Sequence, residues 1–227
     1  MRSGGKILAQ IMAHLAQAVK PGVCLLELNN LAERLIKEAG AEASFKGYKN
    51  FPAALCVCLN DEIVHCSPDK RKIKKSDLVK LDLGVKYKGY HTDMAITLGQ
   101  DRLVRICKKA LKRGLKHVKA GKTIGDIGNA IQRYVESQGY SVIKELCGHG
   151  IGQEVHMPPQ ILNFGKRHKG EILQEGQTIC IEPMISHGMG EIIKKGIGYA
   201  TKDGSLSAHF EHTVLVLKSD CQILTMV

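Results

Sequence analysis

The sequence predicts an α+β fold built from two related halves, each made of two helices, a strand and a hairpin, around curved antiparallel sheets. Three observations predict it. Apolar residues recur first at helical spacing and then in alternation, which is typical of helices followed by strands. The same order begins again after Gly99. Breakers and apolar positions of the two halves align at one offset, which takes Gly22 to Gly121 and Gly40 to Gly139 and indicates duplication.

The first half is expected to contain two helices, then a strand and a hairpin. The helices cover residues 5–19 and 25–39, each followed by a glycine that can end it. An apolar strand follows over residues 53–59. The hairpin pairs residues 79–85 with residues 89–98, since both stretches alternate between apolar and polar side chains.

The second half repeats this order. Basic and apolar residues alternate at helical spacing from residue 103 to 118, a second helix is expected over residues 124–137, and strands over 178–185 and 208–217. No linker rich in proline, glycine or serine separates the halves, so residues 1–227 are predicted to form one domain with internal halves of roughly 1–99 and 100–227.

The predicted hairpin carries two acids, Asp82 and Asp93. If its loop is centred on Tyr87-Lys88, the two acids lie directly opposite each other, where like charges repel. Either both carboxylates are solvated on an open sheet face, or a cation lies between them. The hairpin alone leaves both interpretations open.

The net charge of +11 comes from clusters of basic residues at 70–75, 108–116 and 166–169. Such clusters favour an anionic partner, above all a nucleic acid, although a solvated basic surface fits equally well. No aromatic residues interleave them, as stacking on single strands would require.

No apolar run approaches the roughly 18 residues of a membrane span, and the N-terminus lacks the apolar core of a signal peptide, so a cytoplasmic location is expected. The eight cysteines show neither metal-cage nor disulfide spacing, their only close pair being Cys56-Val57-Cys58, and are expected to be reduced thiols packed among apolar residues.

Further acids and a histidine suit a metal site. The second-half strands carry Glu182 and Glu211, and His149 stands between two glycines. A Gly-His-Gly by itself is more often a tight turn. Four carboxylates and one imidazole, however, form an oxygen-rich set that suits one or two divalent ions. Two ions about 3.5–4 Å apart, bridged by carboxylates, would relieve the repulsion between Asp82 and Asp93.

The sequence resembles the type I methionine aminopeptidases in several motifs at family spacing. They are Asp82 and Asp93 eleven residues apart, GHGIG at 148–152, His156, IEP at 181–183 and SAHFEHT at 207–213. The resemblance covers essentially the whole chain. It implies the pita-bread fold and a single catalytic domain that removes the initiator methionine from nascent polypeptide N-termini when the second residue is small.

The resemblance also implies the metal ligands and the catalytic groups. Asp82 would bind the first metal, Asp93 and Glu211 would bridge both, and His149 and Glu182 would complete the shell of the second. The two divalent ions are cobalt, manganese, iron or zinc. Glu182 would relay the proton of the attacking water.

Two further histidines would contact the substrate. His156 would donate to the carbonyl oxygen of the first peptide bond, and His65 would hold the scissile amide nitrogen or the substrate backbone. The expected methionine pocket consists of the residues that match the family's pocket positions: Tyr48, Phe51, Cys56, Val155 and Ile197.

This chain departs from the family pattern around the pocket but retains every metal ligand. Ile197 stands where a tryptophan is common and Val155 where an aromatic residue is usual, so a wider pocket is expected. Cys66 and Asn50 replace glycines, and Met157 follows His156.

Two rival functions fit parts of the sequence. A proline-specific aminopeptidase or dipeptidase of the same fold usually carries a large extra N-terminal domain, for which 227 residues leave no room. A non-catalytic relative that binds RNA or ribosomes would suit the basic surface but typically loses metal ligands. The expected protein is therefore a monomeric aminopeptidase whose basic surface docks on the ribosome.

Overall fold

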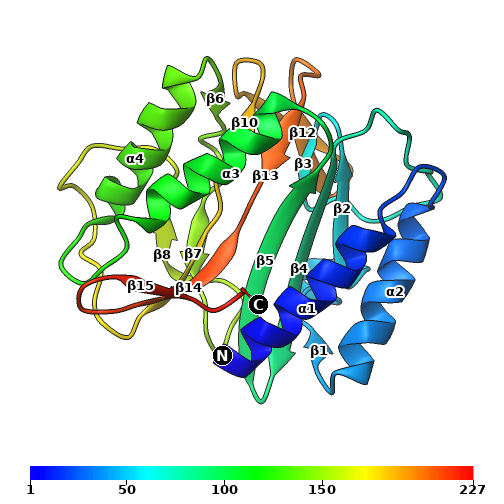
Figure 1. Cartoon of the computed structure of the whole chain (residues 1–227), viewed down its shortest axis with the longest axis horizontal. Helices are drawn as coiled ribbons and strands as arrows, with labels where there is room; N and C mark the ends of the chain where they lie inside the picture. The colour runs from blue at the N-terminus through cyan, green and yellow to red at the C-terminus, as the bar shows by residue number, and fades with distance from the viewer. Residues whose placement is uncertain (227) are drawn as a thin grey trace.

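Two pairs of helices cover one face of the strands in the computed structural model, which describes residues 1–226 (Figure 1). Helices α1 (Arg2–Ala18) and α2 (Leu25–Glu38) lie over the first half, and α3 (Arg102–Leu115) and α4 (Ile124–Ser137) over the second. The four predicted helices are thus present. None of the helices in residues 1–226 is long and apolar enough to cross a membrane.

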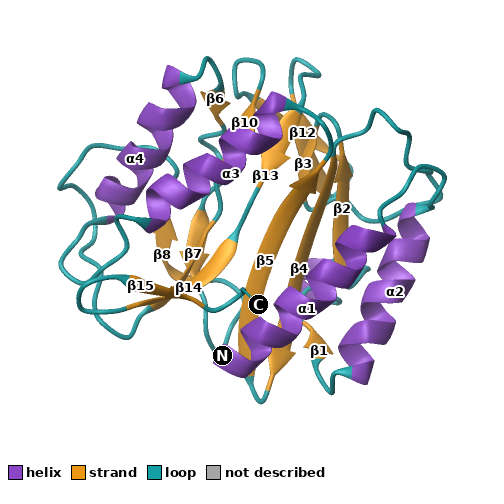
Figure 2. Cartoon of the chain, in the orientation of Figure 1, coloured by secondary structure: helices purple, strands orange, loops and turns teal. Residues whose placement is uncertain are grey.

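The first half contains a four-stranded antiparallel sheet (Figure 2). It consists of β1 (Glu42–Ala43), β2 (Leu55–Leu59), β4 (Val79–Tyr87) and β5 (Tyr90–Leu98), with β4 paired to each of the other three. A single turn of 3-10 helix at Tyr48–Asn50 precedes β2. The apolar faces of α1 and α2 pack on this sheet, and together they form one of the main hydrophobic clusters.

The second half contains a five-stranded antiparallel sheet and a three-stranded one. The larger has the order β15 (Cys221–Ile223), β14 (His212–Val216), β9 (Thr178–Ile181), β7 (Gly148–Gly150), β8 (Met157–Ile161). The smaller has the order β13 (Ser207–His209), β10 (Met184–Ser186), β6 (Ser141–Val142). Helices α3 and α4 pack on these strands around the other main cluster.

A second three-stranded sheet connects the halves. It has the order β11 (Ile192–Lys195), β12 (Gly198–Thr201), β3 (Glu62–Val64), so a first-half strand pairs with a second-half hairpin. Ile96 on β5 also packs against both main clusters. The small sheet and Ile96 thus join the two halves.

The predicted pairing within the first hairpin is wrong by two residues. Asp82 pairs with Ala95, and Asp93 pairs with Gly84, so the two acids are diagonal rather than directly opposed. Because side chains alternate along a strand with a period of two, a shift of two residues keeps both acids on the same face. The two carboxylates are therefore close together, as predicted, although the register differs.

The chemistry of the turn explains this register. Tyr87 and Tyr90 pair across a turn of two residues, Lys88 and Gly89, both of which have positive φ, of 51° and 82°. Two-residue hairpin turns with positive φ at both positions match the twist of the flanking strands, and glycine adopts this conformation without strain. The loop is therefore centred one residue later than predicted, and every pair shifts by two.

Both predicted second-half strands are interrupted at their acids. Residues 178–185 divide into β9 and β10 around Glu182 and Pro183, and residues 208–217 divide into β13 and β14 around Phe210 and Glu211. Proline lacks the N–H that a continuing ladder needs. At the second break, the N–H of Glu211 donates instead to the carbonyl of Ala95 on β5. This bond holds Glu211 against the acidic hairpin.

Candidate metal centre

The five predicted metal ligands line one cavity of about 540 Å³ between the two halves. Asp82 lies on β4, Asp93 on β5 and His149 on β7, while Glu182 and Glu211 occupy the breaks after β9 and before β14. All five are buried. The structure thus brings together residues separated by more than a hundred positions.

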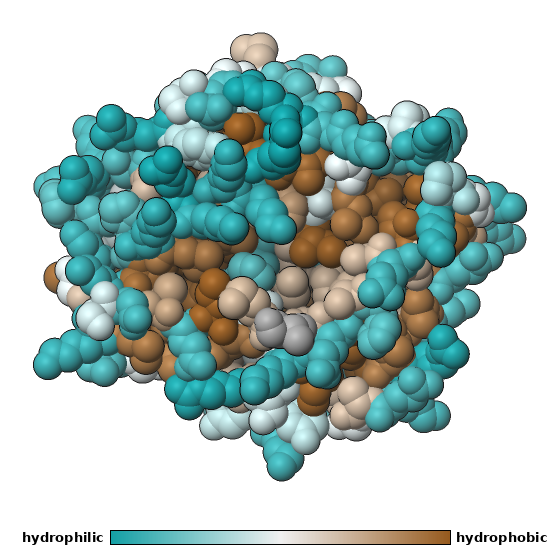
Figure 3. All heavy atoms as spheres, viewed as in Figure 1, coloured by the Kyte–Doolittle hydropathy of each residue, from teal (hydrophilic) through white to brown (hydrophobic). Residues whose placement is uncertain are grey.

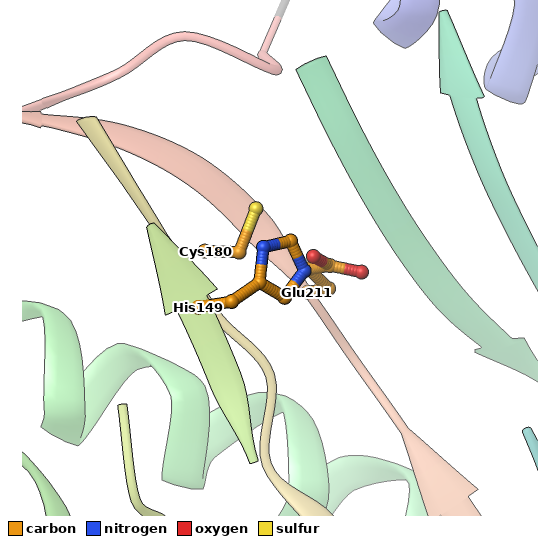
Figure 4. Close-up of side chains that lie close together, drawn as sticks. All are labelled: His149, Cys180 and Glu211. Carbon is orange, nitrogen blue, oxygen red and sulfur yellow. The ribbon is translucent and has the colours of Figure 1, made fainter. Parts of the chain in front are cut away.

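Glu211 is the common member of three possible metal-binding groups. Carboxylate oxygens of Asp82, Asp93 and Glu211 lie within 4.8 Å of one another, which is close enough for a single ion to contact all three. Donor atoms of Glu182, His209 and Glu211 lie equally close, as do those of His149, Cys180 and Glu211 (Figure 4). Glu211 therefore offers an oxygen to each of the three groups that could hold an ion.

The cavity concentrates buried acidic groups that a bound cation would stabilise. Burial, together with the neighbouring carboxylates, raises the pKa values of Asp82, Glu182 and Glu211 well above their usual range, and burial raises the pKa of Asp93 to about 7. Within residues 1–226, no lysine or arginine forms an ion pair with any of the four. Oδ1 of Asp82 and Oε1 of Glu211 are buried without a hydrogen-bond partner. These residues fit divalent cations, which satisfy buried carboxylates in proteins.

The ring of His149 has one nitrogen free to act as a ligand. Its Nδ1 lies 2.9 Å from the carbonyl oxygen of Gly150, and burial lowers its pKa to about 4, so the neutral ring donates from Nδ1 and leaves a lone pair on Nε2. The flanking glycines are required. A side chain at Gly148 would collide with the backbone oxygen of Cys180, and one at Gly150 with that of Pro158. The Gly-His-Gly motif is therefore a strand that lies close against the neighbouring backbone, and not a tight turn.

The predicted substrate-contacting histidines lie on the wall of the same cavity. The ring of His156 is 4.2 Å from that of His149 between centroids, and its Nδ1 lies 3.0 Å from the hydroxyl of Tyr48. Burial and the neighbouring His149 lower the pKa of His156 to about 3, so the ring is neutral. The ring centroid of His65 lies 6.1 Å from that of Tyr199. The backbone of His65 has a positive φ of 61°, which is unusual for a residue other than glycine.

Four of the five predicted pocket residues line the cavity: Tyr48, Phe51, Cys56 and Ile197. Val155 does not. It is buried, and the residue of its segment that faces the cavity is the adjacent His156.

Sequence reasoning missed several residues of the cavity. They are Phe45, Lys49, Asn50, Val64, Leu146, Cys147, Met184, Lys194 and Tyr199. Lys194 and Tyr199 come from the hairpin β11–β12, whose strands of four residues each are too short to show a clear alternation. His209 was also missed, although it ends β13 and shares a possible metal-binding group with Glu182 and Glu211.

Comparison with known proteins gives the family. Residues 1–218 match the family described as metallopeptidase family M24. The chain belongs to metallopeptidase family M24. As a member of that family it is a metal-dependent hydrolase, and the cavity contains clustered carboxylates and histidines that could hold a divalent metal.

The relatives of this M24 chain match it over its full length. It is 39% identical to methionine aminopeptidase 1 of Bacillus subtilis, covering 100% of this chain and 95% of the relative. It is 38% identical to the methionine aminopeptidase of Escherichia coli K12, covering 100% and 90%. The crystal structure of methionine aminopeptidase from Thermotoga maritima superimposes with a TM-score of 0.97 at 37% identity, covering 100% and 95%.

The structural comparison confirms the predicted pita-bread fold. The prolidase of Pyrococcus furiosus shares the fold of this M24 chain, with a TM-score of 0.81 at 23% identity, but the match covers only 62% of the prolidase.

Proposed function

We propose that this chain is a methionyl aminopeptidase that hydrolyses the first peptide bond of nascent proteins and prefers a small second residue. The observation that carries the proposal is the convergence of Asp82, Asp93, His149, Glu182 and Glu211 in one buried cavity of a chain whose relatives are named methionine aminopeptidases at 37–40% identity. The proposed working location is the cytoplasm, where nascent N-termini emerge.

The proposed centre holds two divalent ions, of cobalt, manganese, iron or zinc. Asp82 would bind one, Asp93 and Glu211 both, and His149 with Glu182 the other. When bound, the metal supplies Lewis acidity that polarises the substrate carbonyl and lowers the pKa of water. An oxygen-rich donor set accepts several divalent metals.

The protein residues then move protons and hold the peptide. Glu182 takes the proton of the attacking water and passes it to the leaving amine. The hydroxyl of Tyr48 can donate to Nδ1 of His156, which leaves the hydrogen of the neutral ring on Nε2, free to donate to the carbonyl oxygen as negative charge develops there. His65 is an exposed residue of the cavity wall and would hold the substrate backbone.

The methionine side chain would enter the part of the cavity lined by Phe51, Cys56 and Ile197. Cys56 is buried and packs beside Cys58 and Cys66, which gives the soft, apolar surface that a thioether favours. Ile197 is 51% exposed, so one wall is open to solvent. We therefore propose a wider methionine pocket than a tryptophan at this position would make.

A peptide assay tests the proposal. The enzyme loaded with Mn²⁺ or Co²⁺ is expected to release methionine from Met-Ala-Ser at least about tenfold faster than from Met-Leu-Ser, because the cavity would admit a small second side chain more readily than a large one. Release is measured by chromatography of the free amino acid. Cleavage of Xaa-Pro peptides in preference to Met-Ala-Ser would support the proline-specific rival. Intact peptides with tight binding of ribosomal RNA would support a non-catalytic function.

The basic surface supports a proposed second contact, with ribosomal RNA. The basic residues of α3 are exposed on the face seen in Figure 3, where hydrophilic side chains gather. Co-sedimentation of the monomer with ribosomes is expected at low salt and not at high salt. The double variant Lys108→Glu, Lys109→Glu should lose it, and the matched first-half variant Lys20→Glu, Lys37→Glu should retain it. Equal sedimentation of both variants, or none by wild type at low salt, would contradict this docking.

A further inference from the structure

The carboxylate of Glu182 lies between two imidazole rings. Its Oε1 is 3.5 Å from Nε2 of His149, and its Oε2 is 3.4 Å from Nε2 of His209. The side chains of Glu182 and His149 are 9% and 10% exposed, and that of His209 is 1% exposed. Each oxygen of the central carboxylate thus faces one ring nitrogen in a region with almost no access to solvent.

The two rings differ in where their hydrogen lies. The carbonyl of Gly150 accepts from Nδ1 of His149, so Nε2 of that ring presents a lone pair to the lone pairs of Glu182. Two acceptors that face each other repel unless a cation lies between them. This contact therefore fits two ligands of one metal ion.

His209 has no such carbonyl partner. Neither of its ring nitrogens meets hydrogen-bond geometry with any group in residues 1–226, and the acidic oxygen beside it is Oε2 of Glu182. A neutral imidazole carries one N–H, and a buried N–H without an acceptor is destabilising by about 1–3 kcal/mol. The hydrogen is therefore most stable on Nε2, which lies 3.4 Å from Oε2 of Glu182, whereas a bare Nδ1 leaves only an acceptor unpaired.

Hydrogen bonds to the backbone of His209 hold its ring beside Glu182. The hydroxyl of Thr97 accepts from its N–H at 2.9 Å and donates to its carbonyl at 2.7 Å. His209 also pairs with Met184, two residues after Glu182. The ring on β13 is thus held beside the start of β10, two residues after Glu182.

We propose that His209 is a positioning residue whose Nε2–H donates to Oε2 of Glu182 and turns Oε1 toward the metal that His149 binds. This inference rests on the proposed function and deepens it, because it assigns different roles to the two oxygens of the proton-relaying carboxylate. Groups that orient a metal ligand are typically worth about 10–100-fold in metal affinity or activity.

Two variants test the assignment. His209→Leu removes the donor and should lower kcat for Met-Ala-Ser about 10–100-fold with little change in KM, while His209→Gln, which keeps an N–H donor, should restore most of the loss. Titration calorimetry with Mn²⁺ should give the same number of ions for His209→Leu as for wild type, with weaker binding, whereas His149→Ala should lose one ion. The exposed His187→Gln serves as the control for loss of an imidazole, and circular dichroism checks that each variant is folded.

The readouts separate this inference from the proposed function. In ¹⁵N-detected NMR spectra of the metal-loaded protein, His209 should show hydrogen on Nε2 and His149 hydrogen on Nδ1. Loss of an ion in His209→Leu, as in His149→Ala, would make His209 a metal ligand and overturn the proposal, as would hydrogen on Nδ1 of His209 or unchanged kinetics in His209→Leu. The NMR and calorimetric results need no substrate, so failure to cleave Met-Ala-Ser would overturn the function without deciding the role of His209.

Discussion

Replacing Glu182 with glutamine is expected to lower the rate of methionine release from Met-Ala-Ser by at least about 1000-fold. The substitution removes both a metal ligand and the group that takes the proton of the attacking water, and loss of a general base alone costs about 10²–10⁴-fold. The amide is nearly isosteric and removes a charge from a cluster of four buried acids, so the fold should be retained. Glu182→Ala should be equally inactive.

The matched control is Glu191→Gln, which changes the same side chain on the surface. Glu191 pairs with Lys202, and both side chains are more than half exposed, so its loss should change neither activity nor stability measurably. Initial rates at saturating metal, with melting curves for each variant, provide the measurement. If Glu182→Gln kept more than a tenth of the wild-type rate, Glu182 could not be the proton-relaying group.

Metal loading is expected to stabilise the fold by about 10 °C in the melting temperature. Four buried carboxylates that pair with no lysine or arginine within residues 1–226 are costly in the metal-free protein, and divalent ions relieve this cost. Binding at a thousandfold excess over Kd stabilises by about 4 kcal/mol, which corresponds to about 8–16 °C for a chain of this size.

The Asp93→Ala variant should be more stable than wild type without metal and should be stabilised less by metal. Without metal, it should melt at a higher temperature than wild type, because one of the mutually repelling carboxylates is absent. With metal, it should gain much less, because it lacks a bridging ligand, and it should be inactive. Differential scanning calorimetry with and without Mn²⁺ measures both effects. A wild-type melting temperature that metal leaves unchanged would contradict a metal centre in this cavity.

The sequence was most informative where a residue pattern determines local geometry by itself. Helix α4 begins and ends where predicted, at Ile124 and Ser137, because Thr123 and Asp126 form a capping box at its start. The hairpin was predicted with the wrong register because its alternation is compatible with several loop centres. Only the positive φ at Lys88 and Gly89 selects one of them.

The cavity could be predicted only in part for a similar reason. Its acids lie on strands or at strand breaks, and family motifs mark them, so all five predicted ligands converge in the structure. The wall formed by Lys194 and Tyr199 comes from a hairpin with no strong apolar pattern. The contact between His209 and Glu182 depends on the pairing of β13 with β10, which no local pattern specifies.

Anomalous diffraction from crystals loaded with Mn²⁺ tests the central claim most directly. The predicted result is two peaks about 3.5–4 Å apart, with Asp93 and Glu211 contacting both, Asp82 contacting one, and His149 with Glu182 contacting the other. A single peak, or peaks that Asp93 and Glu211 do not bridge, would contradict the two-metal centre.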